Sequence, residues 1–334
     1  MPTNTAGPEI PYTINVTEEE LGLLKKKLEL LTDAGSDYGA PLVDIEKLVA
    51  RWKGGYDWKK HEAILNAELP QFTRMIAIDG FGELDIHYVH KQSEVKSAIP
   101  LLFVHGWPGS FIEVRKILPL LIAPSEEHPS FHVVAFSLPG FGFSSNPTKR
   151  GFSLDQYAEV GYKLMLALGY NEYVTQGGDW GYHILRRHAH NKAWHTNYPH
   201  ARRYEGHFTE RYDTLPVGLL SWIYEKLVNW SDDYPWEEDE VLTWVSIYWF
   251  SRSGYKEEET HIPMGYSYFP KELWRVPSKW LQAPNLVFEA EHPEGGHFAA
   301  HEKPDYLVGD LRKMFGKGGP AFGVVPGKTG YAAK

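Results

Sequence analysis

Residues 176–182 have the sequence QGGDWGY, the most informative motif of the chain. A short β-type run over residues 173–176 leads into it, and a helical pattern follows it. Gly177 and Gly181 flank Asp179 in the small-x-nucleophile-x-small pattern of a sharp strand-to-helix turn, at whose centre Ser is the usual residue. Such a turn leaves no room for neighbouring side chains and presents the central one to a ligand. The pattern predicts Asp179 as an attacking carboxylate, and the alternative is an Asp that only caps the following helix.

Two further stretches have the same form, IPLLFVHGWPGS at 99–110 and FHVVAFSLPGFGFSS at 131–145. Each is an apolar or β-branched run that ends in a Gly-rich turn, as buried parallel strands do. A late strand over 285–290 and a helix over 303–315 complete the same layer. The sequence therefore predicts an α/β fold with a mostly parallel central sheet, in which ligands bind beyond the carboxyl ends of the strands.

The N-terminal third has a different pattern. Residues 18–31 space Leu at helical intervals, and a second helix is predicted over 43–52. Residues 52–80 look like an aromatic-rich meander that ends in a hairpin around Asp79 and Gly80. We expect this segment to be a lead-in with too few strands to form a sheet of its own.

A helical segment, crowded with Trp, Tyr and acidic residues, interrupts the α/β pattern after residue 196, and we interpret it as an inserted cap. The chain is accordingly divided into an N-terminal lead-in over 1–92, the first part of the core over 93–196, the helical cap over 197–263 and the second part of the core over 264–334.

Composition excludes several classes of protein. Lys and Arg number 34 against 43 Asp and Glu in 334 residues, a net charge of −9 without a basic run, which argues against nucleic-acid binding. Cysteine is absent, so disulfides and thiolate metal sites are excluded. The first twenty residues contain neither a basic leader nor an apolar stretch, and no apolar run is long enough to cross a membrane. We expect a soluble, unexported, cytoplasmic protein without a membrane anchor.

The motif HGWPGS at 105–110 directly follows a predicted strand. Gly106 permits a tight turn and Pro108 fixes the backbone, so the amide of Trp107 can lie beside the amide of Trp180 as a two-donor oxyanion hole. The alternative is an ordinary strand-ending turn with a buried His105.

A candidate general base lies in EGGHFAAHEKP at 294–304, after the last predicted strand. His297 follows two glycines there, and His292 and His301 are its competitors. The chain order of nucleophile, acid and His favours His297.

The acid that orients this histidine should precede the final strand. Glu272 in FPKEL is the candidate, and Glu289 and Glu291 are poorer ones because they lie on that strand or at its end. The alternative for Glu272 is a solvated carboxylate at a helix start.

Together these motifs resemble the epoxide hydrolases of the microsomal type, within the α/β-hydrolase superfamily. The resemblance covers most of the chain: HGWPGS, GGDWG, PVGLLSWIYEKL, FPKEL and GGHFAAHEKP occur in the family's order, behind a family-like N-terminal segment. It implies an α/β-hydrolase fold, with Asp179 as nucleophile, His297 as base and Glu272 as acid. Tyr255 in SRSGYKEE would hold the epoxide oxygen.

The chain also departs from the family pattern. Where the family has a second tyrosine upstream of the PVGL stretch, this sequence has His207, and Tyr204 or Tyr212 could take its place. The segments around 197–205 and 31–39 are shortened against the family pattern, which bears on the geometry of the cap.

An aspartate nucleophile restricts the reaction. Attack on an ester would give a labile anhydride, whereas attack on tetrahedral carbon gives a stable alkyl ester that a second step can hydrolyse. The substrate is therefore expected to be an epoxide or an alkyl halide, and a phenol at Tyr255 favours the epoxide. The predicted partners are a small hydrophobic epoxide and water, with a vicinal diol as product, and no step needs a cofactor or a metal.

Two alternatives stay open at this stage. One is a haloalkane dehalogenase, and the other is a catalytically impaired member of the fold that only binds a ligand. The sequence is compatible with a homodimer but does not specify one.

Overall fold

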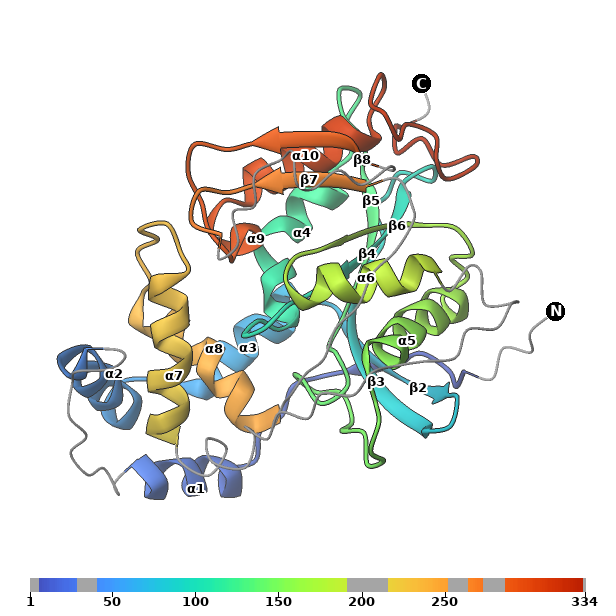
Figure 1. Ribbon diagram of the computed structural model, residues 1–334. Helices are drawn as coiled ribbons and strands as arrows, with labels where there is room; N and C mark the ends of the chain where they lie inside the picture. Colours follow the sequence, from blue (N-terminus) through green and yellow to red (C-terminus); the bar gives the residue numbers. More distant parts are fainter. Residues whose placement is uncertain (1–5, 29–40, 191–215, 252–263, 273–285, 333–334) are drawn as a thin grey trace.

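The computed structural model describes residues 6–28, 41–190, 216–251, 264–272 and 286–332 (Figure 1). The strands are β1 (Ile10–Tyr12), β2 (Gln71–Ile78), β3 (Gly82–Lys91), β4 (Ile99–Val104), β5 (Phe131–Phe136), β6 (Val174–Gly177), β7 (Met264–Tyr268) and β8 (Leu286–Glu291). The helices are α1 (Glu18–Leu28), α2 (Leu42–Gly54), α3 (Trp58–Glu68), the 3-10 helix η1 (Phe111–Glu113), α4 (Val114–Ile122), α5 (Leu154–Ala167), α6 (Trp180–His190), α7 (Pro216–Asn229), α8 (Glu238–Ser251), α9 (Ala299–Glu302) and α10 (Pro304–Phe315).

Within these residues, six strands form one sheet in the order β1-β2-β3-β5-β4-β6, and β7 pairs with β8 separately. The pairs β4/β5, β4/β6 and β7/β8 are parallel, whereas β1/β2, β2/β3 and β3/β5 are antiparallel. The expectation of a mostly parallel sheet is thus confirmed only in part. The reason is that the N-terminal hairpin joins the central sheet through β3 instead of lying apart from it, and a hairpin necessarily adds antiparallel strands.

The parallel strands β4 and β5 form the centre of the core. Every residue of both strands is buried, in agreement with their continuous apolar sequences. The helices α5 and α6 pack against each other and against strands of the sheet, and α4 packs with α9 and α10 in a second group (Figure 1). Because β4 and β6 are parallel neighbours, the turns that follow them meet at one edge of the sheet.

The interpretation of residues 52–80 as a meander is wrong for their first half, which forms helix α3. Asp57 begins this helix by accepting a hydrogen bond from the amide of Lys60 (3.3 Å), and Trp58 and Leu65 bury its inner face. The buried Glu62 carboxylate accepts hydrogen bonds from the amide of Val16 (2.6 Å) and the indole of Trp58 (3.1 Å). One of these bonds lies within the helix and the other joins it to the N-terminal segment, and together they satisfy the buried carboxylate. The predicted hairpin is confirmed as β2 and β3.

The described part of residues 197–263 is helical. Helices α7 and α8 pack against each other and against α1, α2 and α3, away from the sheet (Figure 1). In α8 the residues from Val241 to Tyr248 are all buried, so this helix is enclosed by its neighbours. A bidentate ion pair between Arg51 of α2 and Asp239 of α8 (2.7 and 2.9 Å) joins the N-terminal segment to the inserted segment. The boundaries of the four parts of the chain stay a prediction.

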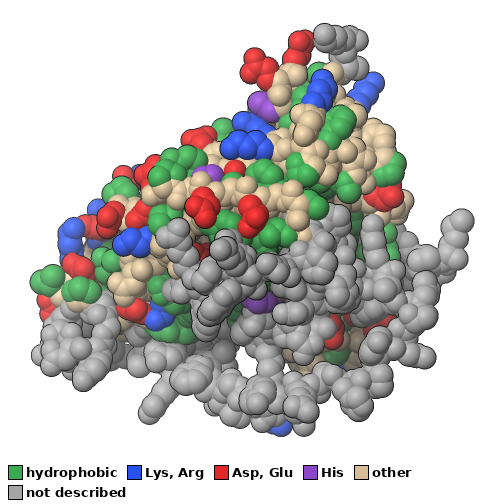
Figure 2. Space-filling view, turned by 45° about the horizontal axis from the view of Figure 1, so that its top comes forward, with side chains coloured by type: hydrophobic (Ala, Val, Ile, Leu, Met, Phe, Trp, Pro, Cys, Tyr) green, Lys and Arg blue, Asp and Glu red, His purple; other side chains and the backbone are tan. Residues whose placement is uncertain are grey.

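The surface agrees with the mixed charge of the sequence. On the face shown in Figure 2, acidic and basic side chains lie interspersed among apolar and neutral ones. Among the described helices, none has the length and the apolar character needed to cross a membrane.

Candidate active site

Asp179 lies on a sharp turn between β6 and α6. Its φ of +50° is in the left-handed region, which non-glycine residues seldom occupy and which Asp and Asn tolerate best. The flanking glycines are required by the close approach of strand β4. A Cβ at Gly177 would lie 2.7 Å from the carbonyl oxygen of Val104, and a Cβ at Gly181 would collide with that same oxygen. The backbone is therefore held in a conformation that presents the Asp179 side chain beyond the end of the sheet.

We expect Gly181→Ala to destabilise the protein by about 2 to 3 kcal/mol or more, because backbone atoms of β4 must move to admit the methyl group. Gly178→Ala is the matched control: its Cβ would meet no atom within 4 Å, and we expect a change within about 0.5 kcal/mol. Urea unfolding of both variants provides the measurement. Equal destabilisation by the two substitutions would contradict this account of the turn.

The loop after β4 supplies a hydrogen-bond donor to Asp179. The amide of Trp107 donates to Asp179 Oδ1 at 2.7 Å, and the Trp107–Pro108 peptide bond is cis. The amide of Trp180 also donates to the Asp179 carboxylate. A Cβ at Gly106 would lie 2.6 Å from the Asp179 Cβ, so glycine is needed for the two turns to approach. The structure thus brings the two predicted oxyanion-hole amides to the same carboxylate.

Helix α8 supports this loop from the other side. The Trp244 indole donates to the carbonyl oxygen of Pro108, and the Tyr248 hydroxyl donates to that of Gly109, both at 2.5 Å. His105 is buried, and its Nε2 accepts a hydrogen bond from the amide of Leu138 (3.2 Å). The buried histidine therefore links the loops after β4 and β5.

His297 faces Asp179 from the loop after β8. Its Nε2 lies 3.7 Å from Asp179 Oδ2, and its Nδ1 lies 2.6 Å from Glu272 Oε1. The His297 side chain is only 5% exposed, whereas that of Glu272 is 39% exposed. Glu272 follows an isolated bridge between Lys271 and Gly296, which brings its segment beside the histidine loop. The three side chains thus form a continuous carboxylate–imidazole–carboxylate array.

The competing residues have other partners. His292 Nε2 lies 2.6 Å from Asp310 Oδ2, and His301 Nε2 lies 2.5 Å from Glu240 Oε1. Glu289 accepts a hydrogen bond from the Tyr268 hydroxyl at 2.8 Å. Their side chains are therefore committed to contacts away from Asp179.

The electrostatics of the array favour an ion pair between His297 and Asp179. Burial alone would lower the pKa of His297, but the hydrogen bond and charge of Glu272, with the charges of Asp179 and Glu113, raise it to about 9. Burial raises the pKa of Asp179, and the charge on His297 together with the two amides opposes that rise. A protonated His297 therefore helps to keep Asp179 ionised.

The family descriptions match this architecture. "Epoxide hydrolase N terminus" matches residues 9–114, and "alpha/beta hydrolase fold" matches residues 99–187. Epoxide hydrolase 1 of the pig, Sus scrofa, is 31% identical in an alignment that covers 92% of this chain and 88% of the pig protein. The chain belongs to the epoxide hydrolase family. The predicted family is thereby confirmed.

Solved structures of epoxide hydrolases agree. The Aspergillus niger epoxide hydrolase superposes with a TM-score of 0.75 at 30% identity, covering 91% of this chain and 95% of that one. The juvenile hormone epoxide hydrolase of the silkworm, Bombyx mori, shares the fold with a TM-score of 0.73 at 24% identity, over 91% and 92% of the two chains. The predicted α/β-hydrolase fold is confirmed.

The alignment with the pig epoxide hydrolase also bears on the shortened segments. It spans 407 positions, although this chain has only 334 residues, so the pig enzyme carries segments that this chain lacks. Four site residues predicted for this epoxide hydrolase family member lie outside the described residues, and their roles stay predictions: Tyr255, His207, Tyr204 and Tyr212.

Sequence reasoning missed Glu113, in the 3-10 helix that follows HGWPGS. Burial raises the pKa of its carboxyl group to about 8, with a further rise from the charge of Asp179 and a reduction from that of His297. The carboxyl group therefore favours its neutral form near neutral pH, and when it ionises its negative charge contributes to the raised pKa of His297. A half-buried glutamate eight residues after His105 has no local sequence signal, because only the fold brings it close to Asp179 and His297.

Sequence reasoning also missed the aromatic wall beside the array. The ring of Trp107 lies 4.9 Å from that of Trp222 and 5.9 Å from that of Trp230, and the Trp230 ring lies 5.1 Å from that of His297. The chain has 12 Trp, 20 Tyr and 16 Phe, but composition alone does not distinguish a ligand-facing wall from ordinary packing. Among the described residues, no group of three or more His, Asp or Glu side chains is arranged to hold a metal ion.

Proposed function

We propose that this protein hydrolyses an apolar epoxide to a vicinal diol through a covalent ester on Asp179. The observation that carries the proposal is the arrangement around one carboxylate. Asp179 Oδ1 accepts the Trp107 amide at 2.7 Å, while Oδ2 faces His297 Nε2 at 3.7 Å. One oxygen is thus held by a donor that stabilises negative charge, and the other is available for attack.

In the first step, Asp179 Oδ2 attacks an epoxide carbon, and the carbon–oxygen bond on the opposite side breaks. The departing alkoxide needs a proton, and a tyrosine hydroxyl is a suitable donor. The family resemblance assigns this role to Tyr255, with His207, Tyr204 or Tyr212 as a second donor. The product of this step is a hydroxyalkyl ester of Asp179.

In the second step, His297 takes a proton from water, and the resulting hydroxide attacks the Asp179 carbonyl carbon. The amides of Trp107 and Trp180 would stabilise the negative charge that develops on Oδ1. Collapse of the tetrahedral intermediate breaks the ester bond, and the proton on His297 passes to the departing diol oxygen. The proton left on the Asp179 carboxyl group returns through solvent to the tyrosine that protonated the alkoxide. Glu272, 2.6 Å from Nδ1, would hold the imidazole orientation and stabilise its charged form.

The same charges change the protonation of His297 between the two steps. Its pKa of about 9 in the free enzyme includes a contribution from ionised Asp179. Alkylation neutralises Asp179 and removes that contribution, so the pKa of His297 falls when the ester forms. The fall shifts His297 toward the neutral imidazole in the step that requires a base.

The substrate class follows from the aromatic wall. The indole rings of Trp107, Trp222 and Trp230 contact one another in a row that ends at the His297 ring, and they supply apolar surface beside the array. An aryl or alkyl substituent on the epoxide would bury its surface there, whereas a charged substituent would lose its hydration.

The test compares three activities of the purified protein. Styrene oxide is expected to give phenylethanediol, and 1-bromohexane is expected to give no bromide. In a single turnover in H₂¹⁸O, the diol should contain ordinary oxygen and the label should enter Asp179, because water attacks the ester and not the epoxide. Bromide release would favour the dehalogenase alternative. Tight binding of styrene oxide without diol would favour the impaired ligand-binding protein.

A further inference from the structure

The loop that carries His297 is held by the connection between α7 and α8. We call residues 230–237 the α7–α8 turn and residues 292–298 the base loop. The amide of His297 donates to the carbonyl oxygen of Trp230 at 2.8 Å, and the amide of Gly295 donates to Asp232 Oδ2 at 2.8 Å. These two amides of the base loop are thus held by the inserted segment, whereas the amide of His292 donates to the carbonyl oxygen of Tyr268 in β7 (3.0 Å) and the carbonyl oxygen of Gly295 accepts from the amide of Lys271 (3.1 Å).

A second carboxylate closes the arrangement from the other side. The amide of Asp232 donates to Glu302 Oε2 at 3.0 Å, and the amide of Phe298 donates to Glu302 Oε1 at 2.9 Å. Glu302 belongs to α9, directly after the base loop. The Glu302 carboxylate therefore connects the α7–α8 turn to Phe298, the residue that follows His297. The Asp232 carboxylate makes a second connection, from the α7–α8 turn to the amide of Gly295.

The close approach of the two segments depends on glycine. A Cβ at Gly296 would collide with the carbonyl oxygen of Trp230 and lie 3.1 Å from Ser231 Cα. Gly295 has a φ of +107°, which only glycine adopts readily. A backbone with two adjacent glycines has little stiffness of its own, so the position of the His297 imidazole depends on what holds the loop.

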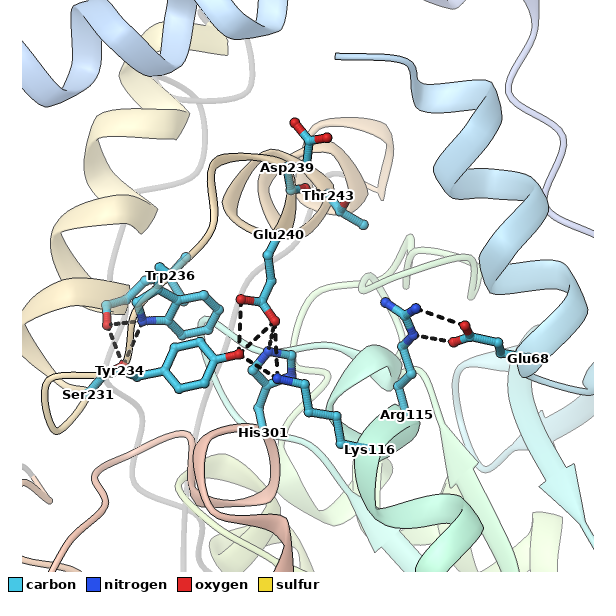
Figure 3. A network of polar contacts seen from close by, with 11 residues as sticks. Glu68, Arg115, Lys116, Ser231, Tyr234, Trp236, Asp239, Glu240, Thr243 and His301 are labelled. Atoms are coloured by element: carbon cyan, nitrogen blue, oxygen red, sulfur yellow. Dashed lines mark hydrogen bonds and ion pairs between the residues drawn. The ribbon is translucent and has the colours of Figure 1, made fainter. Parts of the chain in front are cut away.

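The α7–α8 turn is itself anchored to the core (Figure 3). The Tyr234 hydroxyl donates to Glu240 at 2.9 Å, and Glu240 also contacts His301 Nε2 at 2.5 Å and Lys116 at 3.2 Å. The Trp236 ring stacks on the His301 ring at 5.2 Å with an interplanar angle of 4°. This network connects the turn and α8 with α4 and α9, so the turn is a fixed support for the base loop.

We propose that Asp232 and Glu302 are positioning residues for His297 and act selectively on the hydrolysis of the ester. The inference rests on the proposed function, in which His297 acts as a base only in the second step. Asp179 lies on a different turn, whose contacts with β4 and the loop after it do not involve Asp232. Loss of the Asp232 contact should therefore displace the base without displacing the nucleophile.

The main variant is Asp232→Ala, studied by rapid quenching and mass spectrometry of the Asp179 peptide after mixing with styrene oxide. Ester formation is expected to stay within about two-fold of wild type, whereas ester hydrolysis is expected to slow by about 10- to 100-fold, the effect of a small displacement of a catalytic group. The ester should therefore accumulate during turnover. Asp232→Asn retains an oxygen that can accept from Gly295, and it should recover most of the hydrolysis rate.

Two further variants separate positioning from general damage. Asp233→Asn removes the neighbouring exposed charge and is expected to leave both steps unchanged, because Asn tolerates its φ of +52°. Glu302→Gln retains one acceptor oxygen for two donors, and it should show the same selective slowing with a smaller size. It tests the proposal even if Asp232→Ala fails to fold.

The outcomes are distinguishable. An unchanged ratio of ester hydrolysis to ester formation in both Asp232→Ala and Glu302→Gln, at any overall rate, would overturn the positioning role. If wild type itself forms no ester while producing diol, the proposed mechanism fails, and this inference fails with it. Selective accumulation of the ester that Asp232→Asn largely reverses is the expected result.

Discussion

The Asp179→Asn variant is expected to lose diol formation by about 10,000-fold or more, because a neutral amide oxygen is a far weaker nucleophile than a carboxylate. Asn is the substitution that disturbs the turn least. It tolerates the φ of +50° at this position, and its side-chain oxygen can still accept the hydrogen bond from the Trp107 amide. The loss should therefore be chemical and not conformational.

The measurement is diol formation from styrene oxide, with mass spectrometry of the peptide that contains residue 179. No added substrate mass should be found in the variant, while quenched wild type should carry it on Asp179. Asp233→Asn is a suitable control, since Asp179 and Asp233 are the non-glycine residues with positive φ in the described part of the chain. Diol formation by Asp179→Asn at more than about one hundredth of the wild-type rate would show that another group opens the epoxide.

The motifs around Asp179 and Trp107 could be predicted because their chemistry is local. Glycines at 177, 181 and 106 mark places where backbones approach closely, and the structure places each of them against β4 or Asp179. The candidate pairing of Glu272 with His297 rested on chain order and resemblance. It could not be derived from spacing, because the two residues are 25 positions apart and strand β8 and the start of the base loop lie between them.

Other features depend on tertiary contacts that leave no local pattern. The N-terminal hairpin joins the central sheet because β3 pairs with β5, a partner more than forty residues away along the chain. Helix α3 also depends on a distant segment, since the ring of Trp58 lies 5.2 Å from that of Phe250. Glu113 and Asp232 carry no motif, and only the fold brings them close to Asp179 or to the base loop.

The inserted helices also have a role that a simple cap does not predict. They were expected to cover the substrate, but α8 donates hydrogen bonds to the loop after β4, and the α7–α8 turn accepts one from the backbone of His297. Both halves of the proposed mechanism therefore depend on contacts made by α7 and α8. A change in this segment should alter rate constants as well as substrate preference.

The His297→Gln variant is expected to form the Asp179 ester and then to hydrolyse it about 1,000-fold more slowly than wild type, because no base remains to deprotonate the attacking water. Gln can still donate a hydrogen bond to Glu272, so the array keeps its hydrogen-bond partner. Mixing with styrene oxide should therefore produce close to one ester per protein molecule, followed by very slow release of diol. Intact-protein mass spectrometry over time measures both phases.

The variant should also change how ester formation depends on pH. Burial raises the pKa of Asp179, and the positive charge of His297 opposes that rise. Without His297 the pKa of Asp179 should increase, so ester formation should be slower at low pH and approach the wild-type rate as pH rises and the carboxyl group ionises. His292→Gln is the control, since His292 is paired with Asp310 and should leave the ratio of the two steps unchanged. If His297→Gln remained unmodified while wild type turned over styrene oxide, or if His292→Gln accumulated the ester instead, the assignment of the base would be wrong.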